Sequence, residues 1–292
     1  MTNQKKAYLY AGIAIFFWST VASAFKVGLQ HINFIQFLFF ASWTSLFVLL
    51  IINLFRGNLN KLKSLEKKDL AFSALMGALS PFGYYLVLFK AYEILPAQVA
   101  QPLNMVWPIV LVFLSVILLK QKISYKSFIA LFICFFGVYF ISSQGEPGVF
   151  AFKEPLGVLL AAGSSLIWSL YWIYNVKKGM DETLQLLLNF FFAAIYITIF
   201  ILIFKNFRNL DLTGITLAVY AGIFEMGITF ILWIRAMKYT ASNDKISNLV
   251  YIAPFLSLIF IHYFVGETIY VTSLIGLSLI VLGILVEKLR LI

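Results

Sequence analysis

The sequence has little charge, one cysteine and two histidines, and each shortage excludes a class of protein. Charged residues make up 12% of the 292 residues, whereas 62% are hydrophobic and the mean hydropathy is +0.95. A soluble protein of this length needs a largely polar surface, so this composition excludes an ordinary soluble fold. Most of the protein surface must therefore face lipid.

The sequence also has few residues of the kinds that bind metals or phosphate, and this excludes further classes of protein. Cys134 is the only cysteine, and His31 and His262 lie far apart, so no disulfide framework or metal cluster is expected. The sequence contains no Walker motif, no other glycine-rich phosphate loop and no carboxylates paired at helical spacing. We therefore expect neither an ATP-driven pump nor an enzyme, and no cofactor.

Long apolar runs dominate what remains. A bilayer core of about 30 Å needs roughly 20 apolar residues per helix, and continuous apolar runs indicate helices rather than alternating barrel strands. The sequence predicts an all-α integral membrane protein. Its ten expected spans are 7–29, 33–55, 70–93, 97–119, 125–142, 155–176, 184–204, 213–238, 245–264 and 269–287.

The positive residues behind the net charge of +10 are unevenly distributed between the loops, and this distribution indicates the membrane topology. With the N-terminus placed in the cytoplasm, the inner loops hold fifteen Lys and Arg residues and the outer loops hold three, Lys153, Lys205 and Arg208. This is a positive-inside bias. It predicts a multi-pass protein of the cell (inner) membrane with both termini in the cytoplasm, and it argues against a nucleic-acid partner.

The two halves of the chain repeat each other. Gly83 matches Gly227 and Pro108 matches Pro254 at offsets of 144 to 146 residues, and Trp18 matches Trp168 at an offset of 150. Each half holds five spans, an odd number, so the second half must enter the membrane inverted. Inverted repeats place a binding site near the midplane and permit alternating access. We predict two five-helix repeats, 1–143 and 152–292.

Several stretches give the chain a family resemblance. The motifs are "FWST" in the first span, "NLVYIAPFLSLIF" in the ninth and "VGETIYVTSLIGLSLIVLGI" at the end. With the five-plus-five organisation, they resemble the EamA-type drug/metabolite transporters over essentially the whole chain. Gly266-Glu267 matches the family's Gly-Glu pair, whereas Lys120-Gln121 replaces it in the first half. The resemblance implies export of amino acids, other metabolites or drugs across the inner membrane.

Glu225 is the sharpest candidate for a functional residue. It lies about nine residues into the eighth span, roughly 13 Å deep at 1.5 Å per residue. A charge at that depth costs at least ~2.5 kcal/mol, so it should face a cavity or a partner. We interpret Glu225 as a substrate-binding or proton-coupling carboxylate. The alternative is a protonated hydrogen-bonding group between helices.

The other candidates are two lysines and a set of aromatic and polar residues. Lys26 and Lys245 could reach a substrate carboxylate, although a lysine near a span end also extends readily to the membrane interface. Apolar walls with a few convergent polar groups are typical of a small-ligand cavity, and helix packing accounts for part of the same pattern. The remaining candidates for substrate binding are Trp18, Ser19, Gln101, Asn104, Trp107, Trp168, Tyr171, Trp172, Asn248 and Tyr251.

These patterns favour a secondary transporter that exports a small amphiphilic metabolite, such as an amino acid. Positive and negative groups in one cavity suit a zwitterion, and the aromatic residues suit an apolar or aromatic side chain. A proton is the expected coupling partner, with Glu225 as the coupling residue, and a uniporter is the alternative. Rival hypotheses are a transporter of drugs or other metabolites, and an integral-membrane enzyme that acts on a lipid-linked substrate.

Overall fold

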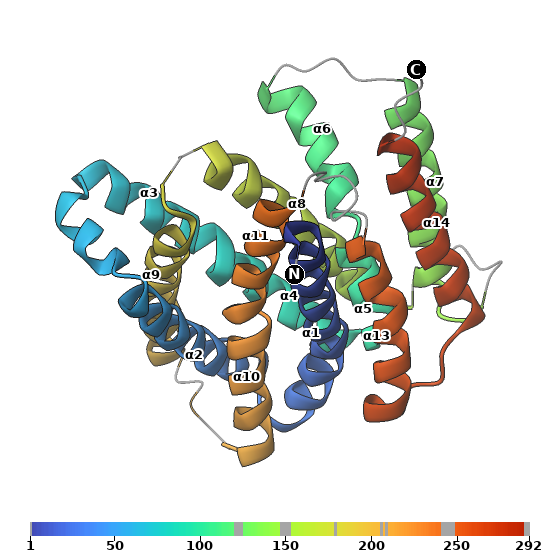
Figure 1. Ribbon diagram of the computed structural model, residues 1–292. Coiled ribbons are helices and arrows are strands. Elements are labelled where there is room, and N and C mark those ends of the chain that lie inside the picture. Colours follow the sequence, from blue (N-terminus) through green and yellow to red (C-terminus); the bar gives the residue numbers. More distant parts are fainter. Residues whose placement is uncertain are drawn as a thin grey trace.

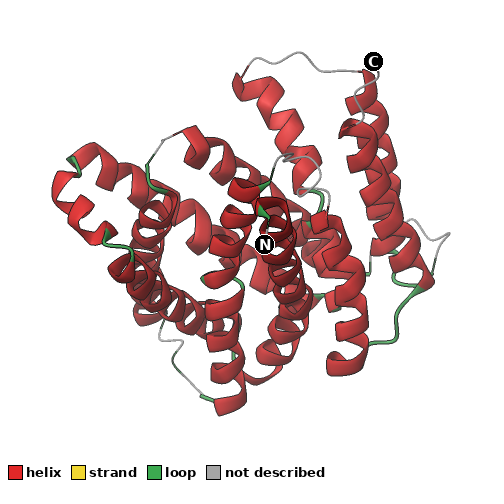
Figure 2. Ribbon diagram, viewed as in Figure 1, coloured by secondary structure: helices red, strands yellow, loops and turns green. Residues whose placement is uncertain are grey.

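The described part of the chain is built from helices, without a strand (Figure 2). The computed structural model describes residues 2–119, 125–146, 153–177, 180–204, 207, 210–240 and 249–288. Within these residues, six segments are long and apolar enough to cross a membrane, and three shorter apolar helices accompany them. The prediction of an all-helical, multi-pass membrane protein is therefore confirmed at this level.

The first half of the chain contains seven α-helices in its described residues. Labels with η mark short 3-10 or π turns. The elements are α1 (Asn3–His31), α2 (Phe34–Phe55), η1 (Asn58–Ser64), α3 (Lys67–Gly77), η2 (Ala78–Gly83), α4 (Tyr84–Ile94), α5 (Ala97–Asn104), α6 (Trp107–Leu119) and α7 (Tyr125–Ser142).

The second half has a corresponding order of elements. Its described elements are α8 (Pro155–Lys177), α9 (Glu182–Ile203), α10 (Leu212–Phe224), α11 (Ile228–Tyr239), η3 (Val250–Ile252), α13 (Ala253–Phe260), η4 (Ile261–Val265) and α14 (Val271–Lys288). We call the end of the bundle at which α1 begins the N-terminal face, and the end at which α1 ends the opposite face.

The helices pack in pairs that correspond between the halves (Figure 1). In the first half, α1 packs against α10, α11 and α13, and in the second half α8 packs against α4, α5 and α6. Two further pairs, α2 with α9 and α7 with α14, join one helix from each half. The first helix of each half therefore packs mainly against helices of the other half.

Two glycines, whose positions differ by 145 residues, permit close contacts between helices. A Cβ atom on Gly77 of α3 would lie 2.5 Å from the Asn189 carbonyl oxygen of α9. A Cβ atom on Gly222 of α10 would lie 2.5 Å from the Ala41 carbonyl oxygen of α2. Only glycine allows the backbones to approach this closely, as is common at helix interfaces in membranes.

Side-chain caps define where several helices begin. Asn33 accepts hydrogen bonds from the backbone N–H groups of Ile35 and Gln36 at the start of α2. Asp181 caps α9 in the same way through Thr183 and Leu184. These oxygens satisfy N–H groups that have no partner within the helix. The two caps lie at opposite faces of the bundle, since α2 begins where α1 ends and α9 begins where α8 ends.

Two of the long spans are interrupted near their middle. Ser80 has an extended conformation (φ −150°, ψ 128°) inside the π turn that separates α3 from α4. Glu225 ends α10, and Gly227 (φ −103°, ψ −87°) separates it from α11. The span predicted over 97–119 is likewise two helices, α5 and α6, divided at Met105. Broken helices expose backbone groups in the bundle interior, where binding sites of transporters are commonly found.

Candidate functional site

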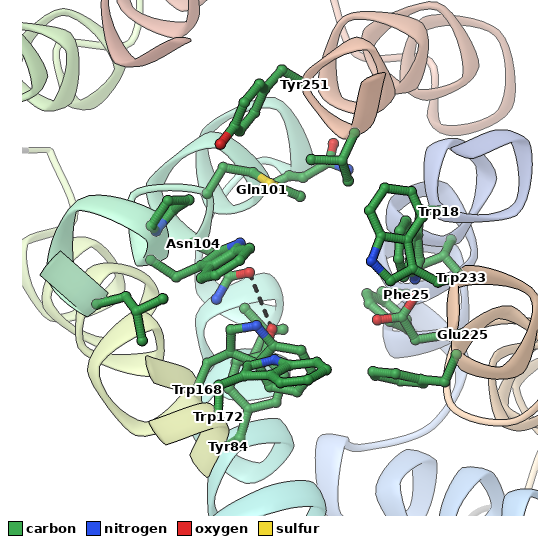
Figure 3. Close-up of a pocket in the computed structure, with 18 of the residues that line it drawn as sticks. Trp18, Phe25, Tyr84, Gln101, Asn104, Trp168, Trp172, Glu225, Trp233 and Tyr251 are labelled. Carbon is green, nitrogen blue, oxygen red and sulfur yellow. Dashed lines mark hydrogen bonds between the residues drawn. The ribbon is translucent and has the colours of Figure 1, made fainter. Parts of the chain in front are cut away.

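A cavity of about 370 Å³ lies between the broken helices. Its described walls come from α1, α4, α5, α6, α8, α10, α11 and η3, so both halves contribute (Figure 3). Most of the lining is aromatic or aliphatic, and a few polar groups converge on it. We call this space the central cavity. Its lining residues are Trp18, Val21, Phe25, Tyr84, Leu88, Tyr92, Gln101, Asn104, Met105, Trp107, Pro108, Leu111, Trp168, Trp172, Glu225, Phe230, Trp233, Val250 and Tyr251.

Glu225 enters the central cavity from the point at which α10 ends. Its Oε1 atom accepts a hydrogen bond of 3.1 Å from the Tyr85 hydroxyl group, whereas its buried Oε2 atom accepts none. In Figure 3 the carboxylate lies beside Trp18 and Trp233 and points toward the space between the two groups of aromatic side chains. An oxygen without a donor in an apolar environment is costly, so this atom favours a ligand that carries an N–H group, or a proton.

The opposite wall of the central cavity is held by a chain of hydrogen bonds. The Tyr84 hydroxyl group donates to Asn104 Oδ1 over 3.1 Å, and Asn104 Nδ2 donates to Ser164 Oγ over 2.8 Å (Figure 3). The Tyr84 ring lies 4.7 Å from the Trp168 ring, centroid to centroid. These contacts fix one amide and two large rings from three helices, α4, α5 and α8.

Aromatic rings line both sides of the Glu225 carboxylate. Trp18 packs against Trp233 with a centroid separation of 5.2 Å, and Trp168 packs against Phe230 at 5.8 Å. The faces of Trp and Tyr rings attract cations. Among the described lining residues there is no Lys or Arg, so in this part of the chain the cavity combines one carboxylate with aromatic surfaces.

Eight of the residues predicted from the sequence line this cavity together. The aromatic and polar positions that the sequence marked in spans one, four, six, eight and nine thus meet in one place. They are Trp18, Gln101, Asn104, Trp107, Trp168, Trp172, Glu225 and Tyr251. The predictions for Lys245 and Asn248 lie outside the described residues.

Three predicted residues do not line the central cavity. The Ser19 hydroxyl group is fully buried and donates to the Ile15 carbonyl group of its own helix. Tyr171 is buried behind Trp168 and accepts a hydrogen bond from Asn189. Lys26 extends away from the cavity, because carbonyl groups at the end of α4 provide its hydrogen-bond acceptors.

Lys26 belongs instead to a set of contacts at the opposite face. Its Nζ atom donates to the carbonyl oxygens of Tyr92 (2.9 Å) and Leu95 (2.7 Å). Glu267 accepts from the backbone N–H groups of Ala97 (2.7 Å) and Gln98 (3.1 Å), at the start of α5. The lysine thus binds the end of α4 and the glutamate the start of α5, each with the charge that complements that helix end.

Gln98 extends this set of contacts to the start of α14. Its side chain donates to the Thr268 carbonyl group (2.9 Å) and accepts from the Tyr270 backbone N–H group (2.8 Å). We call Lys26, Gln98 and Glu267 the α4–α5 clamp. It ties the α4–α5 turn to α1 and to the segment before α14, and so joins the two halves at the opposite face.

Sequence reasoning did not select several of the lining residues, among them Phe25, Tyr84, Tyr92 and Trp233. Their rings are chemically the same as the many rings that face lipid, so residue type alone did not distinguish them. A usable signal was Gly83, which matches Gly227 in the repeat and marks the interruption after which Tyr84 begins α4. Residues that follow such an interruption are positioned to face the interior.

Known proteins are similar to this chain over most of its length. The sequence pattern described as the EamA-like transporter family matches residues 5–143 and 155–286. A protein of Clostridium kluyveri, named an uncharacterized transporter, is 24% identical over 292 residues, which cover 97% of this chain and 93% of that protein. An uncharacterized transporter of Archaeoglobus fulgidus is also 24% identical, over 96% of this chain and 97% of its own length.

A solved crystal structure has a similar fold. It superposes with a TM-score of 0.65 and covers 97% of this chain and 96% of its own chain, at 21% sequence identity. At this level of identity the likeness concerns the fold alone. The family pattern and the names of the relatives together indicate a membrane transporter.

Proposed function

The chain belongs to the EamA-like transporter family, and from this membership and the central cavity we propose that it is a secondary transporter of a small amphiphilic solute. The observation that carries the proposal is Glu225, whose Oε2 atom is buried and accepts no hydrogen bond at the edge of an aromatic cavity. A positively charged amine supplies both the charge and the N–H donors that this oxygen lacks. The solute would therefore carry an ammonium group beside an apolar or aromatic body.

An amino acid fits the cavity through its ammonium group. Lys26, the partner expected for the carboxylate of the amino acid, instead forms hydrogen bonds within the α4–α5 clamp. Within the described part of the cavity, Gln101 and the Asn104 Nδ2 group remain as polar groups on the far wall. An amine without a carboxylate would need neither of them. Amino acids and simple aromatic amines are thus the two solute classes to compare.

We propose that transport occurs by alternating access between two inverted five-helix halves, residues 1–143 and 152–292. The packing of α1 and α8 against helices of the other half and the matched contacts of Gly77 and Gly222 support this arrangement. From the contacts of the α4–α5 clamp we infer that the opposite face is closed and that the central cavity opens to the N-terminal face. With the topology expected from the positive-inside bias, that face is cytoplasmic, and a cytoplasmic solute would load for export.

Glu225 would also couple solute movement to protons. One carboxylate that binds either a proton or an ammonium group allows the two to exchange on opposite steps of the cycle. The Tyr85 hydroxyl group, which donates to Oε1, keeps the carboxylate oriented in both states. If a proton and the ammonium group did not compete for Glu225, the same cavity would serve a uniporter.

Purified protein in proteoliposomes tests this function. Thermal stabilisation against a panel of aromatic amines and amino acids first selects the solute, and flux of that solute is then measured with and without a pH gradient. Glu225→Gln keeps the shape but cannot release a proton, so it should retain solute exchange and lose acceleration by the gradient. Wild-type flux that ignores the gradient would indicate a uniporter. An unchanged gradient response in Glu225→Gln would assign Glu225 a structural role.

A further inference from the structure

A second cavity, of about 330 Å³, lies beside the central one. Its walls come from α8, α9, α11 and the residues that precede α9, close to the N-terminal face. Trp172 and Phe230 line both cavities, so their rings form the partition between the two spaces. The polar groups of this second cavity have no role in the central site.

A buried hydrogen-bond network includes three residues that line the second cavity, Tyr171, Asn175 and Gln185. Gln185 Nε2 donates to Asn189 Oδ1 over 2.8 Å and to Ser73 Oγ over 3.2 Å. Asn189 Nδ2 in turn donates to the Tyr171 hydroxyl group (3.0 Å) and to Asn175 Oδ1 (3.3 Å). The side-chain NH2 groups of Gln185 and Asn189 thus both donate within the network itself.

One acceptor in this network has no donor. Gln185 is only 3% exposed, and its Oε1 atom accepts no hydrogen bond although the residue lines the cavity. Buried amide oxygens are nearly always paired in folded proteins. The lining of the second cavity therefore includes a residue with an unpaired amide oxygen, and a ligand N–H group that reaches it would supply the missing donor.

The second cavity also carries a negative charge. Glu182 lines it and pairs with Lys238 at 2.9 Å, with both side chains at least half exposed. Such a surface pair exchanges partners easily, because exposed ion pairs are weak. Among its described lining residues there is no Lys or Arg. A carboxylate, an unpaired amide oxygen and the rings of Tyr171 and Trp172 thus surround one space.

We propose that the second cavity is a separate binding site for an aromatic amine. Its ammonium group would donate to Gln185 Oε1 and to the Glu182 carboxylate, and its ring would lie against Trp172. The proposal rests on the proposed transport function, since the amine would wait in this site before it passes between Trp172 and Phe230 to Glu225. The alternative is a space that holds only water.

Tryptamine binding to the purified full-length protein tests the proposal. Equilibrium dialysis with radiolabelled tryptamine should give two bound molecules per chain for the wild type. Glu225→Ala should remove the central site and leave one, and Gln185→Leu should remove the second site and leave one. Gln185→Glu keeps an acceptor and adds charge, so in the Glu225→Ala background it should tighten tryptamine binding about tenfold.

A thiol-labelling measurement locates the bound amine independently. Cys134 is buried, so Asn175→Cys supplies the reactive thiol, and tryptamine should slow its labelling even in the Glu225→Ala background. Loss of all binding in Glu225→Ala, or the same affinity for Gln185→Leu and Gln185→Glu, would overturn the second site. Two bound molecules with no flux in proteoliposomes would instead refute transport and leave the site in place.

Discussion

Two regions built on corresponding helices of the proposed repeat have opposite chemistry. In the first half, Phe25 of α1, Phe37 of α2 and Phe89 of α4 pack ring against ring at centroid separations of 4.7 to 5.9 Å. All three are at most 2% exposed. In the second half, α8, α9 and α11 surround the second cavity, where Asn175 and Gln185 occupy the positions of Phe25 and Phe37 at repeat offsets of 150 and 148.

This contrast allows two similarly built halves to favour one conformation. The phenylalanine cluster lies near the end of α1, at the opposite face, and its three rings pack directly against one another. The second cavity lies near the end of α8, at the N-terminal face, where amides and a carboxylate favour water or a polar ligand. Apolar packing thus favours closure at one face, and polar groups favour access at the other.

The largest expected effect comes from a break in the phenylalanine cluster. Phe37→Ala removes a fully buried ring and should destabilise the protein by about 3 kcal/mol, through lost burial and the void left behind. It should also weaken closure at the opposite face. Phe47→Ala on the same helix is the control, because Phe47 is 56% exposed and should change stability little. Thermal unfolding in detergent compares them, and equal shifts in Tm would refute the special role of the cluster.

The matched glycines test whether the two halves pack alike. Gly77→Ala and Gly222→Ala each force a Cβ atom to 2.5 Å from a carbonyl oxygen, so each should lower stability by about 2 kcal/mol. Gly163→Ala serves as control, since a Cβ atom there meets nothing within 4 Å and alanine favours the helix. The measurement is again Tm. A large shift for one glycine and none for the other would argue against the repeat.

The fold was more predictable than the details of the site. Apolar run lengths locate the helices, and a carboxylate among apolar residues such as Glu225 must face a cavity or a partner wherever the neighbours lie. Lys26 was not placed correctly because a long flexible side chain reaches a cavity, a lipid interface or a carbonyl group equally well. Its hydrogen-bond partners, the carbonyl oxygens of Tyr92 and Leu95, could be identified only from the position of the end of α4. Likewise, the sequence did not mark Gln185 as a candidate, because only the packed structure shows that its Oε1 atom accepts no hydrogen bond.

The α4–α5 clamp should control how often the opposite face opens. Lys26→Met removes two charge-assisted hydrogen bonds at the end of α4, which should increase opening about tenfold. Val21→Cys, a buried lining position of the central cavity, reports opening through its labelling by a membrane-impermeant thiol reagent that is added only on the side of the opposite face. Lys153→Met, in an exposed pair with Glu146, is the matched control. Unchanged labelling in Lys26→Met would show that the phenylalanine cluster alone keeps this face closed.

The smallest expected effect concerns Asp181, the residue that caps α9 beside the second cavity. Burial alone raises the pKa of Asp181, but hydrogen bonds from Thr183, Lys61 and the Leu184 backbone N–H outweigh it and lower the pKa to about 2. A carboxyl group with a lowered pKa stabilises the folded state above its ordinary value near 3.8, and this contribution is lost as the pH falls toward 2. The corresponding cap in the first half, Asn33, carries no charge.

Exchange of these two caps tests the comparison directly. Asp181→Asn should lower Tm slightly at pH 7, and its difference from the wild type should shrink as the pH falls from about 4 toward 2. Asn33→Asp places a carboxylate on two backbone N–H groups at the start of α2, so it should introduce a pH dependence of the same sign at the opposite face. The measurement is Tm between pH 7 and pH 2.5 for both variants, which shows whether the charge of each cap contributes to stability. If the Asp181→Asn difference stays constant over this range, the charge of Asp181 adds nothing to the cap, and the rim of the second cavity is held by hydrogen-bond geometry alone.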